Sequence, residues 1–140
     1  MSALTADFDS YIKNERAHNK FSVDAGDAIF VGSLCQMDGA AAYVEAAASG
    51  TSRRIVGQAT KSVLAAKTTD TDIDVREGDI FLHLSEDGAD KPVTTDIGAQ
   101  VYAVSDHEIS MRSATNGVAG ILLAIENGGA LVRCTLEASN

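Results

Sequence analysis

Short apolar runs separated by turn residues are the feature that most restricts how this chain can fold. In the run at residues 79–85, Ile80, Leu82 and Leu84 alternate with Phe81 and His83, which is the period-two pattern of a strand. Comparable runs occupy residues 28–34, 42–45, 55–64, 99–104, 108–112, 118–126 and 130–137. Gly, Asp and Asn lie between them, and Gly128-Gly129 is a two-residue hairpin signal. Short strands at this spacing are typical of sandwiches and barrels, so we expect an all-β fold, a compact β-barrel or β-sandwich.

One strand pattern occurs twice. A glycine-led strand, a polar hairpin and an apolar-Gly-apolar strand follow one another in each copy. Gly26 and Gly98 lead the two copies, and Gly57 and Gly120 stand in their last strands. Two packed copies would close a sheet and remove its edges. We therefore expect one β-barrel domain at residues 21–140, with pseudo-repeats at about 21–64 and 93–137.

Residues 1–20 differ in composition and in apolar spacing from the rest of the chain. They are mostly polar, and Phe8, Tyr11 and Ile12 are isolated apolar residues at a spacing that permits one or two turns of amphipathic helix. So short a helix is not stable alone. We expect an extended N-terminal arm that docks on a neighbouring molecule; docking on its own domain and mobility are the alternatives.

Charge and aromatic content exclude some functions. The net charge is −9, with 20 acidic against 11 basic residues, so the surface should repel nucleic acid. Four Phe, three Tyr and no Trp make a stacking platform for bases hard to build. We expect no direct nucleic-acid partner.

The apolar runs and the cysteines bear on location. The N-terminus lacks the pattern of a secretory signal, and the longest apolar run, residues 118–125, is too short to span a bilayer. We expect synthesis in a cytoplasm and no membrane partner. Because a cytoplasm is reducing, we expect Cys35 and Cys134 to be small core residues. A disulfide between them is the minor alternative.

The candidate catalytic and metal-binding groups are weak in this sequence. Asp70, Asp72 and Asp74 have ligand-like spacing, but the residues that follow do not continue as a calcium loop, so a solvated loop is favoured. Residues 105–107 contain Ser, Asp and His, yet adjacent residues rarely converge as a triad. The three histidines lack ligand spacing. We expect no catalytic residue, no metal site and no cofactor.

The second half of the chain carries a longer pattern. A glycine-led strand at residues 98–102 precedes a hairpin around Asp106 and the run AGILLAIENGGALVRCTL at 119–136. Residues 26–59, which include IVGQA, match the earlier part of that pattern. Over residues 21–137 the chain resembles the small head-decoration, or capsid-cement, proteins of tailed bacteriophages.

This resemblance implies a β-tulip-like domain and a structural role without catalysis. Such proteins commonly sit as homotrimers on the outside of an icosahedral shell, where they bridge major capsid protein subunits and lock the expanded shell. A virion location on the capsid exterior follows from it. Residues 1–20 would be a capsid-binding arm, with Phe8, Tyr11 and Ile12 as its anchors.

Three other functions stay open at this point. A virion-surface or bacterial β-domain that binds a host or glycan ligand would need an exposed aromatic or polar cluster. An enzyme would need a metal at residues 70–74. A bacterial β-barrel protein with another role is also compatible, because a fold does not fix a function.

Overall fold

The computed structural model describes residues 4, 5, 7, 12–38, 43–50, 53–64, 68–85, 89–113 and 116–135, without the side chains of 13–18. The fold is all-β and contains a closed β-barrel, as the sequence predicts. Its elements are β1 (Ile12–Val23), β2 (Leu34–Met37), β3 (Val44–Ala46), β4 (Ile55–Ala59), β5 (Thr71–Leu84), η1 (Thr94–Asp96), β6 (Gln100–Ala103), β7 (Glu108–Ser110), β8 (Val118–Glu126) and β9 (Gly129–Cys134).

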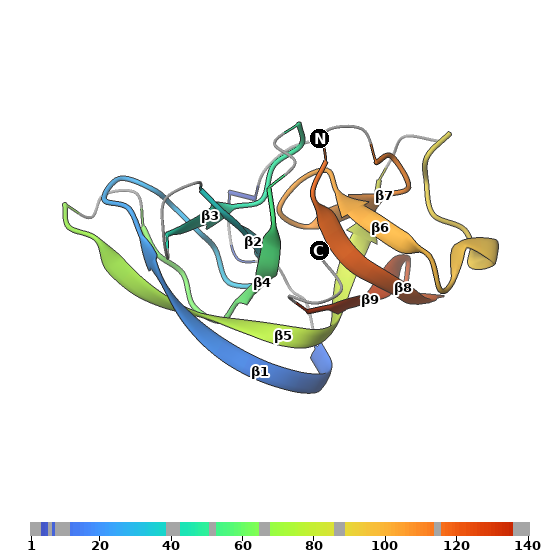
Figure 1. Ribbon diagram of the computed structural model, residues 1–140, viewed down its shortest axis with the longest axis horizontal. Helices are drawn as coiled ribbons and strands as arrows, with labels where there is room; N and C mark the ends of the chain where they lie inside the picture. The colour runs from blue at the N-terminus through green and yellow to red at the C-terminus, as the bar shows by residue number, and fades with distance from the viewer. Residues whose placement is uncertain are drawn as a thin grey trace.

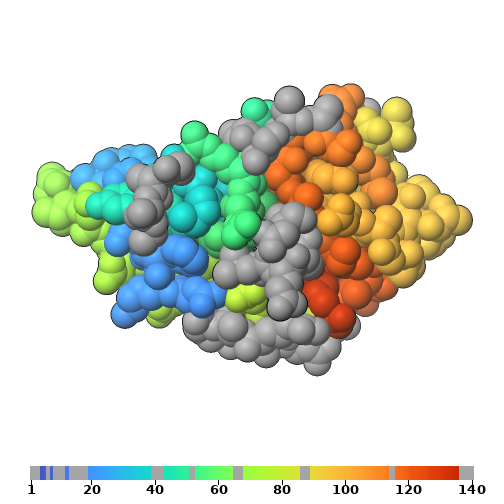
Figure 2. Space-filling view, in the orientation of Figure 1, coloured from blue at the N-terminus to red at the C-terminus, as the bar shows by residue number. Residues whose placement is uncertain are grey.

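Strand β5 is the spine of the molecule. Its 14 residues pair with β1 and β4 toward its start and with β7 and β9 toward its end. Figure 1 shows β5 running along the lower side of the molecule just above β1, with β2, β3 and β4 above its first part and β6 to β9 around its last part. One strand therefore belongs to two units that lie side by side (Figure 2).

The second unit is the closed barrel. Its strands follow the order β5–β7–β6–β8–β9, and β9 pairs again with β5. All its pairings are antiparallel except β5–β7, which is parallel. Closure leaves no open edge in this ring.

The first unit repeats the same pairing order with β1, β3, β2, β4 and the first part of β5. A parallel bridge between Ser22 and Tyr43 joins β1 to β3, in the place of the parallel β5–β7 pair. Cys35 faces Gly57 beside a bulge in the β2–β4 ladder, and Val101 faces Gly120 beside a bulge in the β6–β8 ladder. The two units thus share their irregularities as well as their strand order.

The glycines that lead the two copies are not the pair expected from sequence. The Gly98 N–H bonds the carbonyl of Leu122, and the Leu122 N–H bonds the carbonyl of Ala99. Gly32 has the same relation to Ala59, with the return bond to Ser33. Gly32 and Gly98 also share a left-handed backbone, with φ of 90° and 95°. Gly26 is a turn glycine six residues earlier. The sequence pattern therefore matched Gly98 to the wrong glycine of the first copy.

Gly57 and Gly120 occupy equivalent close contacts between strands. A Cβ atom at Gly120 would lie 2.1 Å from the carbonyl oxygen of Arg133, and one at Gly57 would lie 2.5 Å from that of Arg76. Any side chain at these positions would push two paired strands apart. The central glycine of the apolar-Gly-apolar motif therefore marks, in each unit, a point where two paired strands come into close backbone contact.

Two clusters of small aliphatic side chains form the core. The larger one fills the barrel and includes Ile80, Leu82, Ile109, Leu122 and Val132. The smaller one lies in the first unit around Ile29, Val56 and Ile73. Phe81 is the one aromatic residue among the buried members of the two clusters in the described chain. Aliphatic residues fill narrow barrels without leaving a polar ring atom to satisfy.

Three local expectations were wrong. Residues 70–74 are not a solvated loop, because Thr71–Asp74 begin β5. Residues 28–34 contribute only a bridge at Ile29 before β2 begins at Leu34. The β8–β9 turn is Asn127-Gly128 rather than Gly128-Gly129, with φ of 54° and 76°, the two positive values that a tight two-residue hairpin needs.

Strand β1 crosses the expected boundary at residue 20. It begins at Ile12 and pairs with β5 from Ile12 to Val23, with a register shift between Lys13 and Ala17. Residues 12–20 thus belong to the sheet of their own chain, and Ile12 starts a strand instead of continuing a helical turn.

Candidate functional site

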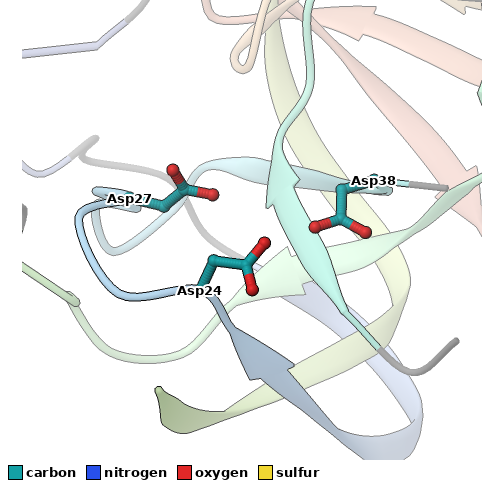
Figure 3. Close-up of side chains that lie close together, drawn as sticks. All are labelled: Asp24, Asp27 and Asp38. Carbon is teal, nitrogen blue, oxygen red and sulfur yellow. The ribbon is translucent and has the colours of Figure 1, made fainter. Parts of the chain in front are cut away.

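Three carboxylates meet at one end of the first unit. Asp24 follows β1, Asp27 closes the turn after it by donating its N–H to the Asp24 carbonyl at 3.1 Å, and Asp38 follows β2. One oxygen of each carboxylate lies within 4.8 Å of the others. Figure 3 shows the carboxylates of Asp24 and Asp38 pointing toward each other, with Asp27 beyond the turn. All three side chains are half-buried.

Asp70, which immediately precedes β5, adds a fourth carboxylate near these three. Its carboxylate accepts the N–H of Ala25 at 3.0 Å and the hydroxyl of Tyr43 at 2.5 Å. These bonds fix the β1–β2 turn and the start of β3 to the same carboxylate. We call Asp24, Asp27, Asp38 and Asp70 the acidic cluster.

The cluster disfavours charge on Asp24. Partial burial raises the pKa of Asp24, and a hydrogen bond with Asp38 and the negative charges of Asp38, Asp70 and Asp27 raise it further. The hydrogen bond to Asp70 likewise raises the pKa of the Tyr43 hydroxyl. Protons or a cation would relieve the repulsion, and oxygen donors of this kind suit hard cations such as Ca²⁺. Acidic groups that solvent reaches are common without an ion, so the geometry establishes electrostatic repulsion and assigns no ligand.

The acidic triplet expected from sequence does not stay together. Asp70 joins the cluster, whereas Asp72 and Asp74 are exposed on one face of β5, with Ile73 buried on the other. Asp72 accepts the Ser22 hydroxyl at 3.3 Å. The period of two in β5 places Asp72 and Asp74 opposite Ile73, whereas Asp70 lies before the strand, which begins at Thr71. Sequence reasoning missed the cluster because β2 and β5 bring Asp38 and Asp70 to Asp24 from distant parts of the chain.

Residues 105–107 come together in space but do not form a catalytic relay. Asp106 Oδ1 lies 3.1 Å from His107 Nδ1, and Ser105 Oγ lies 3.4 Å from the same nitrogen. A triad uses the two opposite ring nitrogens for its acid and its nucleophile. The Ser105 hydroxyl instead donates to Glu108 at 3.0 Å. The His83 and His107 rings meet edge to face at 5.6 Å, a contact the sequence did not reveal.

The expected arm anchors are only partly described. Phe8 and Tyr11 lie outside the described residues. Ile12 is half-buried and packs against the larger core cluster. Of the residues before it, Leu4 also packs against that cluster.

The two cysteines are free and fully buried. Burial raises the pKa of the Cys134 thiol to about 12 and raises that of Cys35 further still. Thiols in such surroundings are poor nucleophiles. They serve here as small core residues, as the sequence predicts.

Comparison with known proteins adds no assignment: no family, no curated protein and no solved structure matches the chain. Within the described residues, helix is limited to short stretches such as the three-residue η1, and none could cross a membrane.

Proposed function

We propose that this chain is a structural virion protein that decorates and stabilises the outside of an icosahedral phage capsid. It would bridge major capsid protein subunits as a homotrimer and would catalyse no reaction. Its place is the capsid exterior, away from the packaged DNA that a net charge of −9 would repel.

One observation carries the proposal. The residues in the second half of the chain that carry the sequence resemblance include β6, β8 and β9, three strands of the closed barrel. Gly120 in this motif allows the close backbone contact between β8 and β9 at Arg133. The shared pattern is therefore one that builds a barrel, which is what a resemblance to a structural protein family should contain.

The polar groups of the described chain are consistent with a structural role. Every buried side-chain nitrogen and oxygen among the described residues has a hydrogen-bond partner. The buried carboxylate of Asp79, for example, pairs with Arg133 at 3.0 Å. Networks satisfied in this way rigidify a fold, and rigidity is what a shell-locking protein requires.

The test is binding to shells of the phage that carries this chain. Purified protein is titrated into expanded, DNA-free shells, and bound protein is measured by co-sedimentation. We expect saturable binding to expanded shells and little binding to unexpanded ones. Equal, non-saturating association with both kinds of shell would contradict the proposal.

The second candidate is a binding module for a host or glycan ligand. Val93 and Ile97, which flank η1, are large apolar side chains with 52% and 49% of their surface exposed. This pair is the observation that favours a ligand contact at the edge of the second unit. Val93→Ser with Ile97→Ser should leave shell binding unchanged under the capsid proposal, and should abolish cell or glycan binding under the alternative.

A further inference from the structure

The backbone of Leu4 is bound by a buried carboxylate. Its N–H donates to both oxygens of Asp106, at 3.0 Å and 3.1 Å. Asp106 lies in the β6–β7 connection of the second unit and is 1% exposed. The Leu4 side chain packs against the larger core cluster. The buried carboxylate of Asp106 is therefore a preformed binding site for the backbone of the N-terminal segment at Leu4.

Asp106 depends on this donor. Its carboxylate also lies 3.1 Å from His107 Nδ1. A buried carboxylate that loses a hydrogen bond is costly. The carbonyl of Asp106 also accepts the N–H of Leu34 in β2 at 2.7 Å, so the receptor loop is held against the first unit. Any segment that replaced Leu4 would have to supply a comparable N–H.

A second tether joins the same segment to the first unit. The Ser62 hydroxyl donates to the carboxylate of Asp7 at 2.6 Å. The Ser62 oxygen also accepts the N–H of Val31 at 3.1 Å. Ser62 lies between β4 and β5. Leu4 and Asp7 thus bind one unit each, and together with Asp106 and Ser62 they form what we call the N-terminal clasp.

We propose that the N-terminal clasp is an autoinhibitory contact: it holds Leu4 and Asp7, which precede β1, on their own chain, and it must open before this part of the arm can bind a neighbouring capsid subunit. The inference rests on the proposed capsid function, because release has a purpose only if the arm has a second site. Its two tethers differ: the Leu4–Asp106 contact is partly buried, whereas the Asp7–Ser62 bond is exposed. Competing water and ions weaken an exposed bond more, so opening begins at Asp7.

The test locks the clasp with a disulfide. In the double variant Asp7→Cys with Ser62→Cys, the new thiols occupy positions whose polar atoms are now 2.6 Å apart. Cys35 and Cys134 are buried and should not compete. On oxidation of the purified protein we expect an intramolecular bond, seen as a monomer on a non-reducing gel with two fewer free thiols. Disulfide-linked dimers, or no bond at all, would overturn the clasp. Each single variant is the matched control.

Shell binding then separates the clasp from the function. The oxidised double variant should bind expanded shells at least tenfold more weakly than the same protein after reduction, while wild type should respond to neither treatment. Equal binding of the oxidised and reduced forms would overturn autoinhibition and leave the capsid function standing. Absence of shell binding by wild type would overturn the capsid function itself, whatever the gel shows.

A second variant tests the receptor without shells. Asp106→Asn keeps the shape of the side chain and removes its charge, so Leu4 should be held less firmly. We expect amide hydrogen exchange at Leu4 to accelerate at least tenfold, with exchange in β8 and β9 unchanged. Unchanged exchange at Leu4 in a folded variant would overturn the role of Asp106.

Discussion

At the scale of single residues, the carboxyl group of Asp24 opposes folding at neutral pH. Its pKa is raised in the folded chain by burial, by the hydrogen bond with Asp38 and by nearby carboxylates. The folded chain therefore binds this proton more tightly than the unfolded chain. By linkage, stability falls as the pH rises from the ordinary pKa of 3.8 through the raised value.

Asp24→Asn should accordingly melt at a higher temperature than wild type at about pH 7 and show no advantage at about pH 3. The gain should shrink in high salt, because screening already weakens the repulsion. Asp74→Asn, on the exposed face of β5, changes the net charge equally and is the control. A lower melting temperature for Asp24→Asn than for Asp74→Asn at neutral pH would contradict this account.

The buried thiols lead to a second prediction at this scale. Burial holds the pKa of Cys134 at about 12 and raises that of Cys35 above its ordinary value, so neither forms thiolate near pH 8. A thiol-specific reagent should label no cysteine in native protein and two in denaturant. Rapid labelling of a native thiol at a rate above that of global unfolding would show that one of them is accessible.

At the scale of elements, local pattern was enough for most strands and for the all-β class. The alternation of Ile80, Leu82 and Leu84 marked β5, and the central glycines marked β4 and β8. Pattern did not fix the length of β5, because Asp72 and Asp74 look like loop residues until their alternation with Ile73 is paired to a partner strand. Nor could it assemble the acidic cluster or the N-terminal clasp, which depend on contacts between distant segments.

The close contact between β8 and β9 at Gly120 leads to a prediction about stability. Gly120→Ala should destabilise the protein by roughly 3 kcal/mol or more, because the new Cβ overlaps the Arg133 carbonyl and parts β8 from β9. Gly57→Ala should behave alike through the Arg76 carbonyl. Gly26→Ala should cost only about 1 kcal/mol, since its φ of 89° is strained but the surrounding space is open. Equal losses of unfolding free energy for Gly26→Ala and Gly120→Ala in urea would rule out the close strand contact as the cause.

At the scale of the whole molecule, two similar units share strand β5. The proposed function requires three copies of the chain to assemble. We expect light scattering to give a concentration-independent mass of about 44 kDa, three times the 14.6 kDa of one chain. A chain that stays monomeric at high concentration and on shells would exclude the trimer. The 63-residue spacing of Gly57 and Gly120 hinted at the paired units in sequence, whereas nothing in the sequence showed that β5 serves both.

The measurement that tests the central claim most directly is a cryo-electron microscopy reconstruction of expanded shells incubated with saturating protein. We predict additional density on the outer surface, at sites between major capsid subunits, into which the two-unit fold built on β5 can be placed. Shells that remain bare at saturating protein, or density confined to the inner surface, would contradict the account.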